Sequence, residues 1–385
     1  MQEDTYLGAL ANEMRAWRRD IHRHPELGFE EHRTCGLVAG LLRSWDIEVT
    51  EGVGGTGVVG TLRGAKGPGM SLGLRADMDA LPMDELGTVA HRSVNPGVFH
   101  GCGHDGHTAI MLGVAKTLAT GKRDFRGAVH FIFQPAEETL GGGSAMLEDG
   151  LFERFPCDEI YALHNINQLP AGMVGVRNGA ILSACDVFRI RIQGVGTHAA
   201  MPHLGIDPIL VGTSLVQSLQ SIVSRNVDPL ETSVVSVCTF NAGTARNVIA
   251  DHAELTGTVR TLSVQTQQLT IKRMQEICDA AATMYHCGIT LEWLVSGPPT
   301  VNAPEQADVV RRAVASTLGA DKLEPDMRPL MASEDFAFML QVRPGAYFFL
   351  GHDGRMCHHP QFDFDDETSP LGVSVFLDIV KQRLG

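Results

Sequence analysis

Three apolar segments with strand character in this chain each end in polar side chains of the kinds that bind metals or move protons. They are residues 71–78 with Asp77 and Asp79, residues 127–133 followed by Glu137 and Glu138, and residues 159–163 followed by His164. Helical patterns lie nearby, as in α/β folds, which place their chemistry at the strand ends of one sheet. The sequence therefore predicts an α/β domain, with a central mixed sheet flanked by helices and a functional site at one edge.

Residues 100–107 read His-Gly-Cys-Gly-His-Asp-Gly-His and put three imidazoles and a thiol into one short loop. The glycines allow the backbone to bend so that side chains converge. If the loop is locally extended, Cys102 and His104 are two residues apart, face one point and form a metal-ligand pair. The alternative is a solvated, inert histidine cluster, and the loop alone does not decide between the two.

The two pairs of carboxylates at the strand ends are expected to have different roles. Asp77 and Asp79 are two residues apart, so alternation along a strand puts both on one face. We expect them to orient a metal-bound histidine, although a solvated strand end or a helix cap would need the same residues. Glu137 and Glu138 are neighbours in an irregular segment and point in different directions, so one can bind metal while the other moves a proton.

A change of pattern near Cys185 predicts a second domain. The predicted order is a strand, a helix, two strands, a helix and a strand, at residues 187–193, 208–223, 232–240, 253–260, 264–285 and 290–295. Such a βαββαβ unit, the ferredoxin-like arrangement, closes as a four-stranded sheet backed by two helices. We expect a catalytic domain in two parts, residues 1–184 and 297–385, with residues 185–296 inserted as a dimerisation or lid domain.

Composition limits the classes of partner. The chain has 385 residues, a hydrophobic fraction of 44%, a charged fraction of 20% and a formal charge of −14. Its acidity disfavours nucleic-acid binding, which relies on clustered Lys and Arg, and no apolar run reaches membrane-spanning length. The first ten residues lack a signal-peptide pattern, so we expect a cytoplasmic protein. The eight cysteines are scattered without CxxC pairs, and most are expected to be small buried hydrophobes, with Cys102 as the exception because it lies among histidines and glycines.

Two other motifs are rejected. Gly55, Gly57 and Gly60 match the GxGxxG spacing, but a strand-like segment follows them where a dinucleotide site needs a helix. Ser144 follows three glycines without the spacing of a nucleophile elbow, which argues against a serine hydrolase. Among the other histidines, we expect His22, His24, His32 and His130 to be structural or on the surface, and His100 and His107 to flank the ligands.

The donor groups exceed what one tetrahedral ion can bind. They comprise one thiol, three separated histidine positions, the last of them in the Cys357-His358-His359 segment, and the Glu137/Glu138 pair. A structural zinc site favours four closed ligands, whereas mixed N, O and S donors with a spare carboxylate suggest two divalent ions sharing a water. The ions would lower the pKa of that water, and the free glutamate would take its proton.

The motifs RADMDALP, HGCGHDGH, FQPAEE, ALHN, GTHAAMPH, ARNVIA, GTVRT, SEDF and HHPQF span the whole chain. This set resembles the metal-dependent amidohydrolases of the aminoacylase and carboxypeptidase superfamily, in the branch of hippurate hydrolases and auxin-conjugate hydrolases. The resemblance implies a general base at Glu137 and five metal ligands, at Cys102, His104, Glu138, His164 and His358. His358 is preferred to His359 because the histidine of the family stands two residues before the proline.

The resemblance further implies a two-domain fold, dimerisation through the inserted domain and cleavage of small N-acyl amino acids. The resemblance implies that His198 polarises the scissile carbonyl and that Asn247 and Arg260 bind the substrate carboxylate. A planar guanidinium such as that of Arg260 is well suited to this task. Arg260 paired with Glu254 on the surface is the alternative. Many relatives outside this branch use an Asp as the bridging metal ligand, whereas here the thiolate of Cys102 would be close to both ions. Zinc, manganese, cobalt and nickel therefore all remain open.

Two other functions remain open at this stage. A metallo-dipeptidase or carboxypeptidase of the same superfamily would use the same metal centre, and sequence separates it poorly from an N-acyl amino acid hydrolase. A metal- or ligand-binding protein without turnover would be expected to lack Glu137, which is present.

Overall fold

The computed structural model describes residues 2–385, with side chains from residue 8 onward, and divides them into two compact units. Unit 1 comprises residues 1–181, 301–328 and 335–385, and unit 2 comprises residues 182–300 and 329–334. The sequence pattern places the boundaries at 184/185 and 296/297 and does not anticipate that residues 329–334 join unit 2. They do so because they run beside its first residues, where the N–H of Ser183 donates to the carbonyl of Ala332 at 2.9 Å.

The large sheet of unit 1 has the strand order β1-β2-β4-β3-β5-β16-β6-β15. Its strands are β1 (Glu48–Val53), β2 (Gly57–Arg63), β3 (Ser71–Asp77), β4 (Ala128–Gln134), β5 (Glu159–Ile166), β6 (Val174–Gly175), β15 (Leu323–Glu324) and β16 (Gly345–Gly351). Strands β3, β4, β5 and β16 run parallel, whereas β2 is antiparallel to β4. The mixed α/β sheet predicted from the sequence is thereby confirmed.

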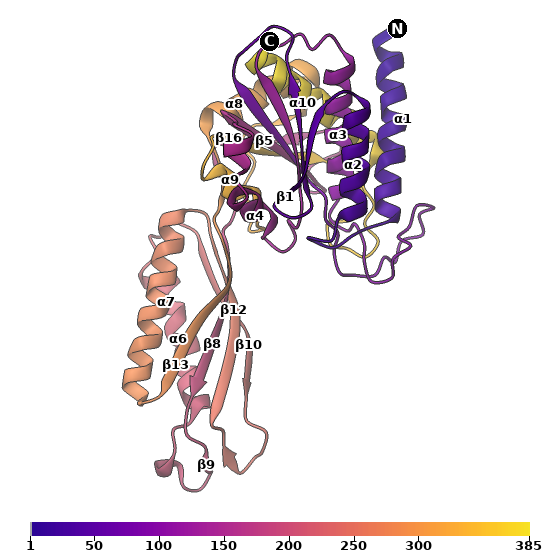
Figure 1. The fold of residues 1–385 in the computed structure, drawn as a ribbon. Helices are drawn as coiled ribbons and strands as arrows, with labels where there is room; N and C mark the ends of the chain where they lie inside the picture. Colours follow the sequence, from indigo (N-terminus) through magenta and orange to yellow (C-terminus); the bar gives the residue numbers. More distant parts are fainter. Residues whose placement is uncertain (1) are drawn as a thin grey trace. The chain divides into compact units, whose positions relative to one another are not determined.

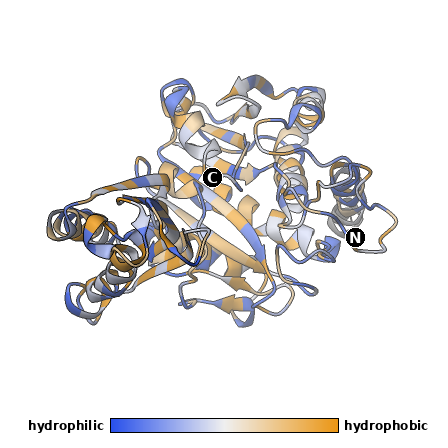
Figure 2. Ribbon diagram, turned by 90° about the horizontal axis from the view of Figure 1, so that it is seen from below, coloured by the Kyte–Doolittle hydropathy of each residue, from blue (hydrophilic) through white to orange (hydrophobic). Residues whose placement is uncertain are grey.

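Helices cover both faces of this sheet. They are α1 (Gln2–Arg23), α2 (His32–Ser44), α3 (His104–Thr120), α4 (Gly142–Glu148), α5 (Leu151–Arg154), α8 (Pro304–Thr317), α9 (Phe336–Leu340) and α10 (Ser369–Leu384). Strands β4 and β16 are buried at every position, as expected for strands that helices cover on both sides. Figure 2 shows the central strands as largely hydrophobic, whereas the surrounding helices mix hydrophobic and hydrophilic residues.

Unit 2 has the predicted βαββαβ order. Its main elements are β8 (Cys185–Gln193), α6 (Pro208–Arg225), β10 (Ser233–Ala242), β12 (His252–Thr261), α7 (Val264–Tyr285) and β13 (Gly288–Gly297). The strands form an antiparallel sheet in the order β10-β12-β8-β13, and α6 and α7 lie together on one face of it (Figure 1). Every second residue of β12 is buried, which is the alternation that a sheet with one covered face requires.

Short elements complete the chain. The strands β9 (Thr197–His198) and β11 (Val248–Ile249) pair with each other in unit 2, and β7 (Gly179–Leu182) pairs with β14 (Thr300–Asn302). No helix among residues 2–385 combines the length and the apolar character needed to cross a membrane.

Candidate metal centre

The loop at residues 100–107 bends sharply, unlike the extended segment expected from its sequence. Gly103 has φ 98° in the left-handed region, and helix α3 begins at the next residue, His104. A Cβ atom on Gly103 would also lie 2.1 Å from the Oδ1 atom of Asn165, so both the conformation and the space require glycine. Cys102 and His104 therefore face one point because of a turn into a helix, and the reasoning from strand alternation was wrong.

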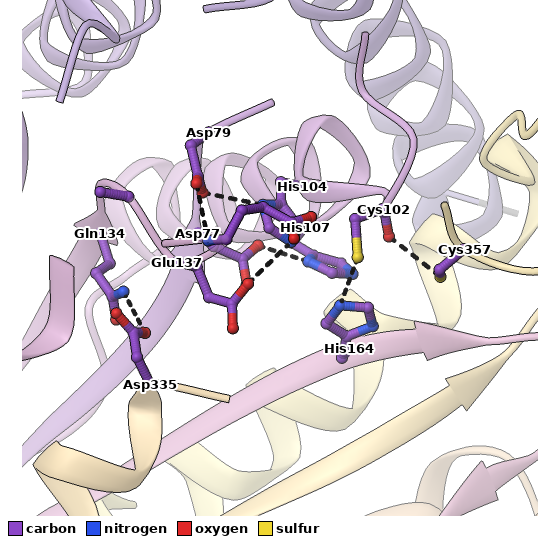
Figure 3. A network of polar contacts seen from close by, with 12 residues as sticks. Asp77, Asp79, Cys102, His104, His107, Gln134, Glu137, His164, Asp335 and Cys357 are labelled. Atoms are coloured by element: carbon purple, nitrogen blue, oxygen red, sulfur yellow. Dashed lines mark hydrogen bonds and ion pairs between the residues drawn. The ribbon is translucent and has the colours of Figure 1, made fainter. Parts of the chain in front are cut away.

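Strand ends and loops bring the candidate ligands together in unit 1. The Sγ atom of Cys102 lies 3.5 Å from Nε2 of His164, and Nε2 of His358 lies 3.4 Å from Oε1 of Glu138. Each of the groups Cys102/His104/His164, Cys102/Glu138/His358 and His104/Glu137/Glu138 has donor atoms within 4.8 Å of one another. Figure 3 shows most of these side chains converging at the carboxyl ends of the strands.

His164 and His358 reach the site from different supports. His164 lies inside β5, which continues to Ile166 beyond the strand end expected from the sequence, and it pairs in register with Phe349 of β16. His358 lies in a loop with a left-handed backbone, φ 66°, and its N–H donates to the carbonyl of Gly101 at 2.7 Å. That bond fixes the loop beside the start of α3.

The donor set fits divalent cations. Nε2 of His104 is buried and has no hydrogen-bond partner in the described chain, although it points into the ligand groups and lies 3.9 Å from Oε1 of Glu138. A buried polar atom without a partner is costly, so this nitrogen fits a position that would bind a cation. Burial holds the pKa of His164 well below its ordinary value, which keeps its imidazole in the neutral form that binds metals. Cys102 belongs to two of the groups, as a ligand close to two ions would.

The two aspartates support different histidines. Oδ1 of Asp79 lies 3.1 Å from Nδ1 of His104, and its Oδ2 accepts from the N–H of Glu138 at 3.0 Å. Oδ1 of Asp77 instead lies 2.6 Å from Nδ1 of His107, whose ring packs edge-to-face against that of His164 without joining the predicted ligand set. Burial would raise the pKa of Asp77, but the charges of His104, His107 and Arg75 together bring it well below its ordinary value. Asp77 is therefore an anion that holds His107 next to the candidate ligands.

A buried arginine beside the site has no role in the sequence-based interpretation. Arg75 donates to Asp77 at 2.7 Å, to Gln134 at 2.9 Å and to Asp335 at 3.2 Å. Asp335 in turn accepts from the backbone N–H of Gly143 at 2.7 Å. These residues occur in the quoted motifs RADMDALP, FQPAEE and SEDF, but only the folded chain brings them into one network. Figure 3 shows one of its contacts, between Gln134 and Asp335.

The sequence-based interpretation also gave Cys357 no role in the site. Its thiol donates to the carbonyl of Cys102 at 3.5 Å and accepts from Nδ2 of Asn165 at 3.4 Å. Because Oδ1 of Asn165 lies 2.7 Å from Nε2 of His107, the cysteine extends the support that begins at Asp77. The adjacent His358 was the signal that could have drawn attention to it.

The predicted substrate-binding residues all lie in unit 2, but not in one place. His198 in β9 pairs with Val248 of β11, and the carbonyl of the preceding Asn247 accepts from Ala199 at 3.0 Å. Arg260 lies near the other end of β12, eight residues beyond its first residue, which corresponds to about 25 Å of extended strand. Asn247 precedes β12 by five residues, whereas Arg260 lies near the far end of that strand. We therefore expect the two side chains of one protomer to lie too far apart to bind one carboxylate, which differs from the sequence-based expectation.

A second histidine cluster in unit 1 does not have the character of a metal site. His22, His91 and Asp363 have donor atoms within 4.8 Å of one another, but the buried guanidinium of Arg18 already lies 3.1 Å from His91 and 2.7 Å from Asp363. An arginine there supplies the positive charge that a metal ion would bring. His22 is fully buried in this cluster and is a structural histidine.

Comparison with known proteins identifies the family. The model of "Peptidase family M20/M25/M40" matches residues 73–382. The chain is 39% identical to hippurate hydrolase from Campylobacter jejuni over 97% of both chains, and 38% identical to thermostable carboxypeptidase 2 from Saccharolobus solfataricus over 92% of this chain and 91% of that one. A dinuclear metal-binding M20 peptidase from Bacillus subtilis superposes with a TM-score of 0.84 at 31% identity, covering 97% of this chain and 98% of that one. The chain belongs to peptidase family M20/M25/M40.

Proposed function

We propose that the protein is a metal-dependent amidohydrolase that cleaves N-acyl amino acids into a carboxylic acid and a free amino acid. The observation that carries this proposal is the position of Glu137, whose Oε2 lies 3.8 Å from Nε2 of His104 beside the candidate ligand groups. The similarity to hippurate hydrolase, which covers nearly the whole chain, supports the choice of substrate class.

Five residues would hold two divalent ions: Cys102, His104, Glu138, His164 and His358. When bound, such ions supply Lewis acidity toward the amide carbonyl and toward water. Glu137 is 7% exposed and lies next to the ligand Glu138, so its carboxylate can take a proton from the attacking water. As the C–N bond breaks, the same carboxylate delivers that proton to the leaving nitrogen. Asp79 keeps His104 and the backbone of Glu138 in place.

The proposal divides the substrate-binding residues between two protomers. His198 and Asn247 would serve the substrate bound by the partner, with His198 polarising the scissile carbonyl, and Arg260 would grip the substrate carboxylate in its own protomer. The position of Arg260, about 25 Å along β12 from the first residue of that strand, supports this division, because Asn247 lies before that first residue.

A homodimer formed through unit 2 is part of the same proposal. Helix α6 has no charged residue from Pro208 to Ser224, and it exposes apolar side chains such as Leu210, which is 58% exposed. Strand β10 beside it is an edge strand of its sheet. An uncharged helix next to an open strand edge is a surface that a second copy can cover, and natural proteins commonly cover such edges.

The cellular setting and the metals are proposed on simpler grounds. All eight cysteines are free, which fits a reducing compartment such as the cytoplasm. The mixed thiolate, imidazole and carboxylate donors suit zinc, manganese, cobalt or nickel. A carboxypeptidase is the second candidate function, because the similarity to thermostable carboxypeptidase 2 is nearly as high.

Substrate panels and two neighbouring variants test the proposal. The protein should hydrolyse hippurate and N-acetyl amino acids faster than dipeptides with a free amino group; the reverse preference would favour the carboxypeptidase. Glu137→Gln should keep its metal content and lose on the order of 100- to 10,000-fold in kcat, as removal of a positioned general base does. Glu138→Gln should lose metal as well, and the exposed Glu148→Gln serves as the control. Near-normal turnover of Glu137→Gln would refute the assignment.

A further inference from the structure

The turn that carries Glu137 has an unusual backbone. Ala136 has φ 50° in the left-handed region, although it is neither glycine nor asparagine, and it is fully buried. A non-glycine residue in this region costs of order 1 kcal/mol or more and persists only where its surroundings hold it. Because Ala136 immediately precedes Glu137, whatever holds this conformation also sets the direction of the glutamate.

A buried carboxylate from a distant segment contacts this residue. Oε1 of Glu31 accepts a hydrogen bond from the N–H of Ala136 at 2.8 Å, and its Oε2 accepts from the hydroxyl of Thr56. Glu31 is 0% exposed, and both of these partners are neutral. Burial raises the pKa of Glu31, with nearby Asp79 adding to the rise, while the hydrogen bonds from Thr56 and Ala136 oppose it. A carboxylate buried in this way is unfavourable for stability unless something requires it.

Helix capping does not explain Glu31. The residue occupies the N-cap position of α2 but makes no side-chain cap bond there. Glu26 satisfies the first turn of that helix instead, because its two carboxylate oxygens accept from the N–H groups of Arg33 and Thr34, each at 2.8 Å. The side chain of Glu31 is therefore directed away from its own helix and toward the turn of Ala136.

Gly28, in the same segment, also lies close to Ala136. A Cβ atom added to Gly28 would lie 3.0 Å from both Cα and Cβ of Ala136, closer than real Cβ contacts normally come. Glycine at this position lets the chain pack directly against the turn. Gly28 and Glu31 thus hold Ala136 from one side, while the carbonyl of Ala136 accepts from the N–H of Gly142 at 3.1 Å on the other.

We infer that Glu31 is a positioning residue for the reaction: its hydrogen bond to Ala136 holds the left-handed turn that aims Glu137 at the reacting water. The inference rests on the proposed role of Glu137 as the general base. The side chain of Glu31 bonds to Ala136 and Thr56, neither of which is a candidate metal ligand. Its effect should therefore be seen in kcat and should depend on Glu137.

The experiment compares Glu31→Ala with Glu31→Gln in the metal-loaded enzyme. Glu31→Ala should lower kcat on the order of 10- to 100-fold, the cost of misplacing a catalytic group by about 1 Å, with KM and bound metal nearly unchanged. Glu31→Gln should restore most of kcat, since its amide oxygen can accept from Ala136 and its NH₂ can donate to Thr56. Glu26→Ala is the matched control: it disturbs the start of the same helix and should lower the melting temperature without lowering kcat.

A double variant separates positioning from general stability. In the Glu137→Gln background, Glu31→Ala should cause little further loss, because the group that it positions is already inactive. An equal loss in both backgrounds, or an unchanged kcat in Glu31→Ala, would overturn the inference. Normal turnover of Glu137→Gln alone would instead overturn the proposed function.

If Glu31→Ala does not fold, Gly28→Ala takes its place. It keeps the Glu31 carboxylate but pushes Ala136 out of position, and should lower kcat with the same dependence on Glu137. Full activity of Gly28→Ala would contradict the inference.

Discussion

The stability of unit 1 should depend on pH through His22, which lies between two buried carboxylates. Nδ1 of His22 lies 2.8 Å from Oδ2 of Asp105, and its Nε2 lies 3.3 Å from Oε1 of Glu85. Burial by itself would lower the pKa of His22, but the hydrogen bonds with Asp105 and Glu85 raise it to about 9. The histidine is therefore expected to be protonated in the folded protein at neutral pH.

The size and sign of the effect follow from linkage. A folded-state pKa of about 9, compared with 6.5 for the unfolded chain, corresponds to about 3 kcal/mol at roughly 1.36 kcal/mol per unit. Because the folded state binds the proton more tightly, this contribution is fully present below pH 6.5. It is lost progressively as the pH rises through 9.

Urea unfolding of the metal-free protein between pH 6 and 10 measures this contribution. The difference in unfolding free energy between the unaltered protein and His22→Gln should shrink by about 3 kcal/mol over that interval. His24→Gln changes a partly exposed histidine on the adjacent turn. Its difference in unfolding free energy from the unaltered protein should stay constant over the same pH interval. A difference that stays constant from pH 6 to 10 would show that His22 is not protonated in the fold, and would refute the reasoning.

Two further predictions concern unit 2. Arg260→Ala should raise KM about 10- to 100-fold for hippurate-like acids, because it removes a charge-assisted hydrogen bond to their carboxylate. KM for the matching amides should change little, and Arg191→Ala is the exposed control. Equal effects on both substrate types would exclude Arg260 as the group that binds the substrate carboxylate. Leu210→Glu should produce a monomer by light scattering, and that monomer should be inactive because it lacks the partner's His198. Met284→Glu on the exposed face of α7 should remain a dimer, and a fully active Leu210→Glu monomer would contradict the shared site.

Periodicity predicted the long elements well. The sequence pattern gave α7 its observed bounds, Val264–Tyr285, because apolar residues at helical spacing extend along its whole length. The two-residue strands β6 and β15 were not predicted, since so short a segment has no period to recognise. β5 was predicted too short because His164 and Asn165 are polar, although they continue the strand and are held by pairing with β16.

The sequence also predicted much of the candidate site, but not all of its local structure. The strand ends with Asp77, Glu137 and His164 meet because β3, β4 and β5 are parallel neighbours, as the α/β pattern implied. The turn at Gly103 was not foreseen, since glycine permits both an extended and a left-handed backbone, and only the closeness of Asn165 selects one.

By itself, the sequence determined the fold class, the inserted unit and the types of side chain available to the site, because hydrophobic period and residue chemistry are local properties. Only the tertiary structure decided which partner each group takes: Asp77 with His107, Arg75 with Asp335, and Glu31 with the N–H of Ala136. It also placed Arg260 near the far end of β12, whereas Asn247 lies in the connection before that strand. Such pairings join residues far apart in the chain and depend on how elements pack, which no local pattern records.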